Sequence, residues 1–127
     1  MENVVDRWIR SGLVWVLLTM FYGMYVGISG EFALKSSHAH AGILGGLWSL
    51  AFAFLFSRKT TPPRFAFAQW LLFNIGVAVH VFALYMVVTR GGIWGMLIGV
   101  AGLLIIVSTL WIAASVWPRV AERSSPG

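Results

Sequence analysis

Apolar residues fill four long stretches of the chain, and short polar segments separate these stretches. They cover approximately residues 8–28, 38–56, 65–88 and 93–117. A helix needs roughly 20 apolar residues to cross the hydrocarbon core of a bilayer, which is about 30 Å thick. Each stretch therefore predicts one membrane-spanning helix. The predicted fold class is an all-α membrane protein, a bundle of four transmembrane helices in a single domain over 1–127, with a polar tail at 118–127.

The composition indicates the same class. Hydrophobic residues make up 59% of the chain and charged residues only 10%, and the mean hydropathy is +0.84. A soluble domain of this size has about 25% charged residues, so the charges here are too few to cover a soluble surface. The first apolar stretch is also longer than the core of a cleavable signal peptide, and we expect it to be retained. The chain has no cysteine, which excludes disulfides and thiolate metal sites.

The net charge of +5 reflects membrane topology rather than nucleic-acid binding. The cations lie at the ends of the apolar stretches and form no stripe that would follow a phosphate backbone. Lys and Arg gather on the cytoplasmic side of membrane proteins. One side of the predicted bundle carries seven cations and the other carries two, Lys35 and Arg90. Both termini are therefore predicted to be cytoplasmic, and we expect the inner (plasma) membrane of a bacterium or archaeon. The seven cations are Arg7, Arg10, Arg58, Lys59, Arg64, Arg119 and Arg123.

Glycines and tryptophans lie at positions that membrane helices use. Gly42, Gly45 and Gly46 follow the first histidines in the second stretch, and spaced small residues let helix backbones approach closely in lipid. Helix packing is one interpretation of these glycines, and room for a flat macrocycle beside the helix is the other. Tryptophans near the predicted span ends are typical of an interfacial belt. These are Trp8, Trp94, Trp111 and Trp117.

The three histidines of the chain are the leading candidates for chemistry. An ionisable side chain inside a membrane is costly and indicates function. His38 and His40 are two residues apart, which places them about 200° apart around a helix, so they do not point into one site. The second and third spans are antiparallel neighbours, and this places His40 and His80 in the same, outer leaflet. Two facing imidazoles predict the axial ligands of a b-type haem.

Other interpretations remain open at this stage. The histidines would also suit a copper-binding or other metal-binding membrane protein, and a cofactor-free accessory subunit of a larger membrane complex would need no ligand. Asn74, in mid-span, is expected to hydrogen-bond to another helix, a bond worth about 0.6 kcal/mol on average in membrane proteins. No nucleophile–base pair, phosphate loop or carboxylate dyad is present in the sequence, so a stand-alone enzyme is not expected.

Two segments resemble the catalytic subunit of haem-copper oxidases and nitric oxide reductases. These segments are SSHAHAGILGGLWSLAFAF, with its His-x-His, and FAQWLLFNIGVAVHVFAL, with Trp70 followed by Asn74 and Gly76. The resemblance covers about half of the chain and implies haem iron and electron transport. It also implies that His38 and His40 would hold two different haems, on opposite faces of one helix. His80 would then be a replacement axial ligand, within one chain or across a subunit interface.

Together these arguments define the expected site. A four-span bundle offers little lateral surface to enclose a macrocycle, so we expect a homo-oligomer or a larger membrane redox complex in the lipid bilayer. Haem b is the expected cofactor, with copper as the alternative. The predicted cofactor-binding residues are His38, His40, His80, Gly42, Gly45, Gly46 and Asn74, and the three histidines are the predicted metal ligands.

Overall fold

The computed structural model describes residues 3–58 and 64–124, and within them every long element is a helix. The α-helices are α1 (Val4–Ser29), α2 (Lys35–His40), α3 (Trp48–Ser57), α4 (Ala66–Arg90) and α5 (Trp94–Ser124). A 3₁₀ turn, η1 (Phe32–Leu34), leads into α2. A π-helical segment, η2 (Ala41–Leu47), joins α2 to α3, so the second span runs without a break from Phe32 to Ser57.

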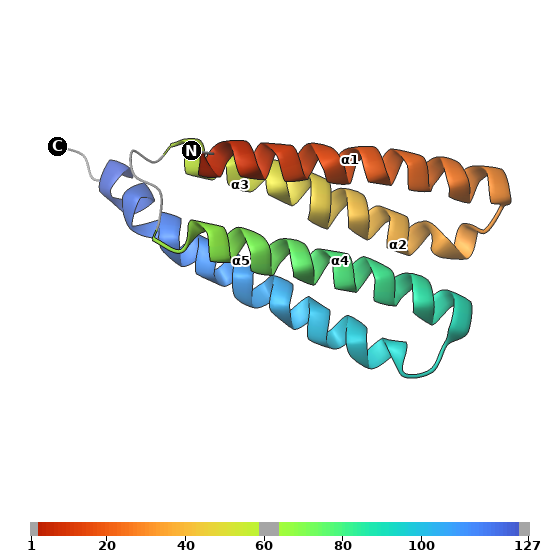
Figure 1. Ribbon diagram of the computed structural model, residues 1–127. Coiled ribbons are helices and arrows are strands. Elements are labelled where there is room, and N and C mark those ends of the chain that lie inside the picture. Colours follow the sequence, from red (N-terminus) through yellow and green to blue (C-terminus); the bar gives the residue numbers. More distant parts are fainter. Residues whose placement is uncertain (1–2, 59–63, 125–127) are drawn as a thin grey trace.

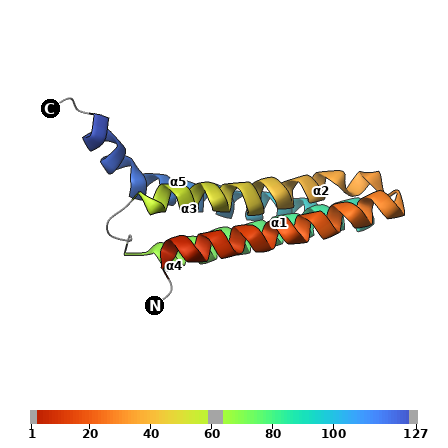
Figure 2. The same ribbon diagram turned by 90° about the horizontal axis from the view of Figure 1, so that it is seen from above.

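Four helices are long and apolar enough to cross a membrane, which confirms the four predicted spans. The first span begins at Val4 and the second at Phe32, several residues before the bounds that the apolar pattern gave. Helix α5 also continues through Ser124, although residues 118–127 were expected to be a polar tail. Figure 2 shows its last turns bent away from the remainder of the helix. The sequence of α5 includes one proline, Pro118, and proline kinks a helix because it lacks the N–H donor.

The chain forms two antiparallel helix hairpins that lie side by side. Helix α1 packs on η2 and α3, and α4 packs on α5 (Figure 1). Gly30 ends α1 with a φ of 70°, and Gly91 and Gly92 turn the chain between α4 and α5 with φ values of 64° and 75°. Only glycine adopts such angles without strain. Both hairpin turns lie at one end of the bundle, and the start of α1 and the end of α5 lie at the other (Figure 1). The two termini therefore share one side, whereas the identity of that side remains a prediction.

The described core is an aromatic cluster where α1, α3 and α4 meet. The Trp8 side chain is fully buried, and its ring centroid lies 5.0 Å from that of Phe52, 6.3 Å from that of Phe56 and 5.5 Å from that of Phe73. The prediction that Trp8 belongs to an interfacial belt is therefore wrong. The cause is the rotation of α1 about its axis. The position of Trp8 near a span end suits the interface, but the face of α1 that carries Trp8 is turned toward the other helices. Trp117, by contrast, is 73% exposed.

Candidate histidine site

Two imidazole rings face each other between α2 and α4. The ring centroids of His40 and His80 are 5.2 Å apart, and the ring planes are inclined at 44°. One turn before His40, the buried Ser37 donates a hydrogen bond of 3.0 Å to the carbonyl of Val81. This bond holds α2 against α4 at the level of the rings. The structure thus brings together the two histidines that the antiparallel spans were expected to place in one leaflet.

The hydrogen bond of His40 fixes which of its nitrogens is available. Its Nδ1 lies 2.7 Å from the backbone carbonyl oxygen of Ser36. A carbonyl only accepts, so Nδ1 carries the proton and the neutral ring keeps its lone pair at Nε2. Histidines that bind metals almost always donate their other ring N–H to a carbonyl or carboxylate in this way. His40 is therefore prepared to coordinate through Nε2.

His80 presents a polar atom that is buried and lacks a hydrogen bond. Its Nδ1 is inaccessible and has no partner among the described residues. The ring lies beside the Ile98 backbone of α5, and a Cβ built on Gly102 would lie 3.9 Å from Nδ1. Burying an unpaired polar atom costs free energy. The nearby Ile98 backbone is the described group that can offset part of this cost.

His38 points away from this pair, toward α1. Its ring lies 6.1 Å from that of Tyr22 in an edge-on arrangement. A Cβ on Gly23 would come within 2.6 Å of His38 Nε2, so the absence of a side chain at Gly23 makes room for the imidazole. The separation of His38 from His40 is the one that their spacing of two residues predicts. The buried hydroxyl of Tyr22 has no hydrogen-bond partner in the described part of the chain.

The three glycines after the histidines face α1. A Cβ on Gly42 would lie 3.0 Å from Thr19 Cγ2, and one on Gly46 would lie 2.9 Å from Val16 Cγ2. A Cβ on Gly45 would overlap the ring of Trp15. Side chains of α1 thus fill the space beside these glycines, as the helix-packing interpretation expects. Their role in binding a cofactor stays a prediction.

The π-helical segment is the feature that sequence reasoning missed. It starts at Ala41, directly after His40, and contains all three of these glycines. π-Helical turns are rare and occur frequently at functional sites. The sequence AGILGGL gave a signal, since a glycine-rich run weakens an α-helix, but that signal does not distinguish a π segment from a close helix contact.

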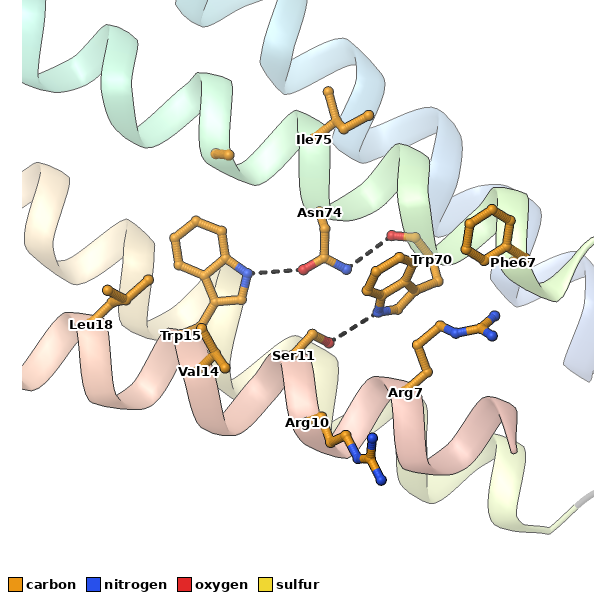
Figure 3. A pocket seen from close by; sticks show the side chains of 11 residues that line it. Arg7, Arg10, Ser11, Val14, Trp15, Leu18, Phe67, Trp70, Asn74 and Ile75 are labelled. Carbon is orange, nitrogen blue, oxygen red and sulfur yellow. Dashed lines mark hydrogen bonds between the residues drawn. The ribbon is translucent and has the colours of Figure 1, made fainter. Parts of the chain in front are cut away.

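Asn74 links α1 to α4 and lies apart from the histidine pair. Its Oδ1 accepts a bond of 2.9 Å from Trp15 Nε1, and its Nδ2 donates one of 2.9 Å to the Trp70 carbonyl. Trp70 Nε1 in turn donates to Ser11 Oγ at 3.2 Å (Figure 3). The expected interhelical hydrogen bond is therefore present. Asn74 precedes His80 by six positions, about 9 Å along the helix axis. Its hydrogen bonds orient α1 and α4, and its role at a cofactor stays a prediction.

Within the described residues, no three histidine, cysteine or acidic side chains lie close enough together to hold one metal ion. The donor set that the structure assembles is thus a pair of imidazoles from two different spans. Comparison with protein-family models, with curated proteins and with solved structures found no match. The resemblance to haem-copper oxidases accordingly rests on the two quoted segments.

Proposed function

We propose that the protein is a membrane-bound b-type haem protein that transfers electrons or senses redox state or gas, with His40 and His80 as the ligand pair. One observation carries this proposal: the two imidazoles face each other from neighbouring spans at a centroid separation of 5.2 Å. A pair of neutral histidines on facing helices is a suitable donor set for haem iron. Bound haem would supply one-electron redox chemistry.

The two imidazoles offer the type of donor atom that haem iron binds. His40 offers Nε2 because the Ser36 carbonyl occupies its Nδ1. His80 is partly buried, with Ile98 and Gly102 of α5 beside its ring, so a neutral imidazole suits its environment. Ser36 would hold the His40 ring in orientation, and the helices themselves would exclude water from the centre.

The spacing of the rings tests the fit more strictly. A metal lies about 2.0–2.1 Å from a ligating nitrogen, hence roughly 3.2 Å from the centre of the ring. Two rings on opposite sides of a haem iron would therefore have centroids roughly 6.4 Å apart. The observed 5.2 Å is shorter. For the iron ligands alone, haem binding would have to part α2 from α4 by about 1 Å. The macrocycle would need a further opening between these helices, which would break the bond between Ser37 and Val81.

The same spacing favours a second candidate, a copper or zinc ion held directly between the imidazoles. With roughly 3.2 Å from metal to each ring centre, a separation of 5.2 Å corresponds to a nitrogen–metal–nitrogen angle of about 110°, close to tetrahedral. At this spacing the ion would require no widening between the two rings. Its remaining coordination positions would be filled from outside the histidine pair.

Visible spectra and metal analysis of the detergent-purified protein distinguish these candidates. For the haem protein we expect sharp bands of six-coordinate b-type haem after dithionite reduction. His40→Ala and His80→Ala should each abolish these bands, whereas the matched control His38→Ala should keep them because His38 packs on α1. If the bands survive both of the first two changes, the ligand pair is wrong.

A colourless protein with about one copper or zinc per chain, lost in His40→Ala and His80→Ala, would favour the metal-ion candidate instead. A protein without haem or metal, purified from haem-sufficient and metal-sufficient cells, would contradict both and leave the accessory-subunit interpretation. We further propose a homo-oligomer or a larger redox complex, because a four-span bundle alone has little surface to surround a macrocycle. The proposed location is the plasma membrane of a bacterium or archaeon.

A further inference from the structure

A cavity lies between the two hairpins, where α1 faces α4 (Figure 3). It has a volume of about 660 Å³ and opens to the outside of the bundle. Pockets for small ligands have volumes of roughly 300–1,000 Å³. We call this cavity the α1–α4 groove, and it is large enough for a small organic molecule that enters from the surrounding lipid. Its lining includes Ser11, Trp15, Phe67, Trp70, Asn74 and Ala78.

Aromatic rings form much of the groove wall. Trp15 belongs to α1, whereas Phe67 and Trp70 belong to α4. The rings of Phe67 and Trp70 are stacked, with centroids 5.8 Å apart and planes inclined at 26°. Figure 3 shows the two indoles on either side of the Asn74 side chain. Aromatic side chains pack favourably on other flat rings, so this wall suits a flat, unsaturated ring better than a flexible saturated chain.

The hydrogen bonds inside the groove leave one donor unused. Both indole N–H groups are occupied, because Trp15 donates to Asn74 Oδ1 and Trp70 donates to Ser11 Oγ. The amide nitrogen of Asn74 carries two hydrogens. One of them donates to the Trp70 carbonyl of the same helix, and the other forms no hydrogen bond within residues 3–58 and 64–124. Asn74 therefore offers one N–H to an acceptor in the groove.

This N–H lies at a depth where the groove opens to hydrocarbon rather than to bulk water. Asn74 follows the start of α4 at Ala66 by eight residues, about 12 Å along the helix axis. The hydrocarbon core of a bilayer is about 30 Å thick. A polar group without a partner in that region costs free energy. A ligand with a carbonyl oxygen would remove this cost, whereas a hydrocarbon chain would leave it in place.

We propose that the α1–α4 groove binds a membrane quinone, with one ring carbonyl accepting from Asn74 Nδ2 and the ring packed on the indoles of Trp15 and Trp70. A quinone combines the features that the groove selects: an uncharged flat ring, carbonyl acceptors and a hydrocarbon tail. The tail would lie along Leu18 and Ala78, which continue the lining toward the middle of the membrane. The inference concerns binding and does not depend on the histidine pair, so loss of haem or metal leaves it unaffected.

Thermal unfolding of the detergent-purified protein tests the proposal, with decylubiquinone and decylbenzene as the added ligands. Both carry a decyl chain on a flat ring, but decylbenzene has no acceptor. We expect decylubiquinone to raise Tm at lower concentrations than decylbenzene does. Asn74→Leu removes the donor, so it should weaken decylubiquinone binding by up to about tenfold, the net effect of one hydrogen bond. His40→Ala is the control and should keep the wild-type response. Equal Tm shifts for both ligands would overturn the proposal.

A variant that fills the groove tests the location separately. Ala78 is exposed and lines the groove, so Ala78→Phe should reduce the number of decylubiquinone molecules that native mass spectrometry counts per chain. Ala114→Phe, on the exposed face of α5, should leave this number unchanged. Unchanged decylubiquinone binding in a helical Ala78→Phe protein would overturn the proposal. So would a phospholipid that co-purifies in place of a quinone and is lost in Ala78→Phe, because the occupant would then be an acyl chain.

Discussion

Gly45 is the position where the ring of Trp15 approaches the backbone of the second span. A Cβ at this position would overlap the indole. Neither group is the far end of a flexible chain, so Gly45→Ala must push α1 away from η2. Overpacking of this kind costs typically about 1–3 kcal/mol. We expect Gly45→Ala to lower stability by this amount in reversible unfolding with sodium dodecyl sulfate, monitored by circular dichroism.

Gly99 provides the matched control for this change. It also lies within a helix, but a Cβ there would meet nothing within 4 Å. Alanine is favoured over glycine in a helix by up to about 1 kcal/mol. Gly99→Ala should therefore be neutral or slightly stabilising. Equal destabilisation by the two variants would show that Trp15 does not depend on the absence of a side chain at Gly45.

Asn74 supplies the polar connection between α1 and α4. Asn74→Leu would remove the acceptor for Trp15 Nε1 and leave that indole N–H without its partner. Interhelical hydrogen bonds in membrane proteins contribute about 0.6 kcal/mol on average, with a maximum near 1.7. We expect Asn74→Leu to reduce the free energy of unfolding within this range, measured by the same titration.

Thr89→Val serves as the control for Asn74→Leu. Among the described residues, the exposed Thr89 bonds only to the Tyr85 carbonyl of its own helix. It should change stability by less than Asn74→Leu. A larger loss in Thr89→Val would contradict the importance assigned to the connection between Trp15 and Asn74.

The directions of single side chains were predictable only where two positions share one helix. The spacing of His38 and His40 is enough to separate them by about 200°, and the structure places one toward α1 and the other toward α4. Trp8 shows the limit. Its place near a span end is readable from sequence, but its burial depends on how α1 is rotated against α3 and α4. That rotation is set by contacts between segments far apart in the chain.

The π-helical segment η2 couples the histidines to the glycine contacts. A π segment holds one more residue per turn than the α-helix around it, so it rotates the residues before it relative to those after it. Removing Ile43 should restore α-helical winding and rotate one part against the other by about 100°. After this rotation, His40 cannot face His80 if Gly46 keeps its contact with Val16. We expect the deletion to abolish haem or metal retention.

Ile43→Ala is the control for the deletion. Ile43 is 53% exposed, so truncating its side chain removes little packing and leaves the winding unchanged. This variant should retain the cofactor at the wild-type level. If the deletion also retains it, η2 is not what aligns the histidine pair.

The elements themselves were largely predictable because apolar length sets a membrane span. All four spans were expected, and all four are helices. The bounds were less accurate, since Val4 and Phe32 extend spans beyond the apolar pattern. The hydrogen bond between Ser37 and Val81 and the winding of η2 were not predictable. Both features depend on how neighbouring helices pack against each other. Neither produces a periodic pattern that could be recognised in the amino-acid sequence.

The two ends of the whole bundle carry different numbers of cations. The start of α1 and the end of α5 share one end (Figure 1). Arg7, Arg10, Arg58 and Arg64 lie toward that end, and Lys35 and Arg90 lie near the hairpin turns. Because Lys and Arg favour the cytoplasmic side, the termini should be cytoplasmic and the turn at Glu31 external. The histidine pair, near the turns, would then lie in the outer leaflet.

Reporter fusions test this orientation directly. A green fluorescent protein fused after Gly127 should fluoresce, and alkaline phosphatase fused there should be inactive, because phosphatase matures only outside the cytoplasm. Phosphatase inserted at the exposed Glu31 should be active. The opposite pattern would reverse the bundle. It would place the histidine pair in the cytoplasmic leaflet. The orientation therefore decides from which side of the membrane the histidine pair would be reached.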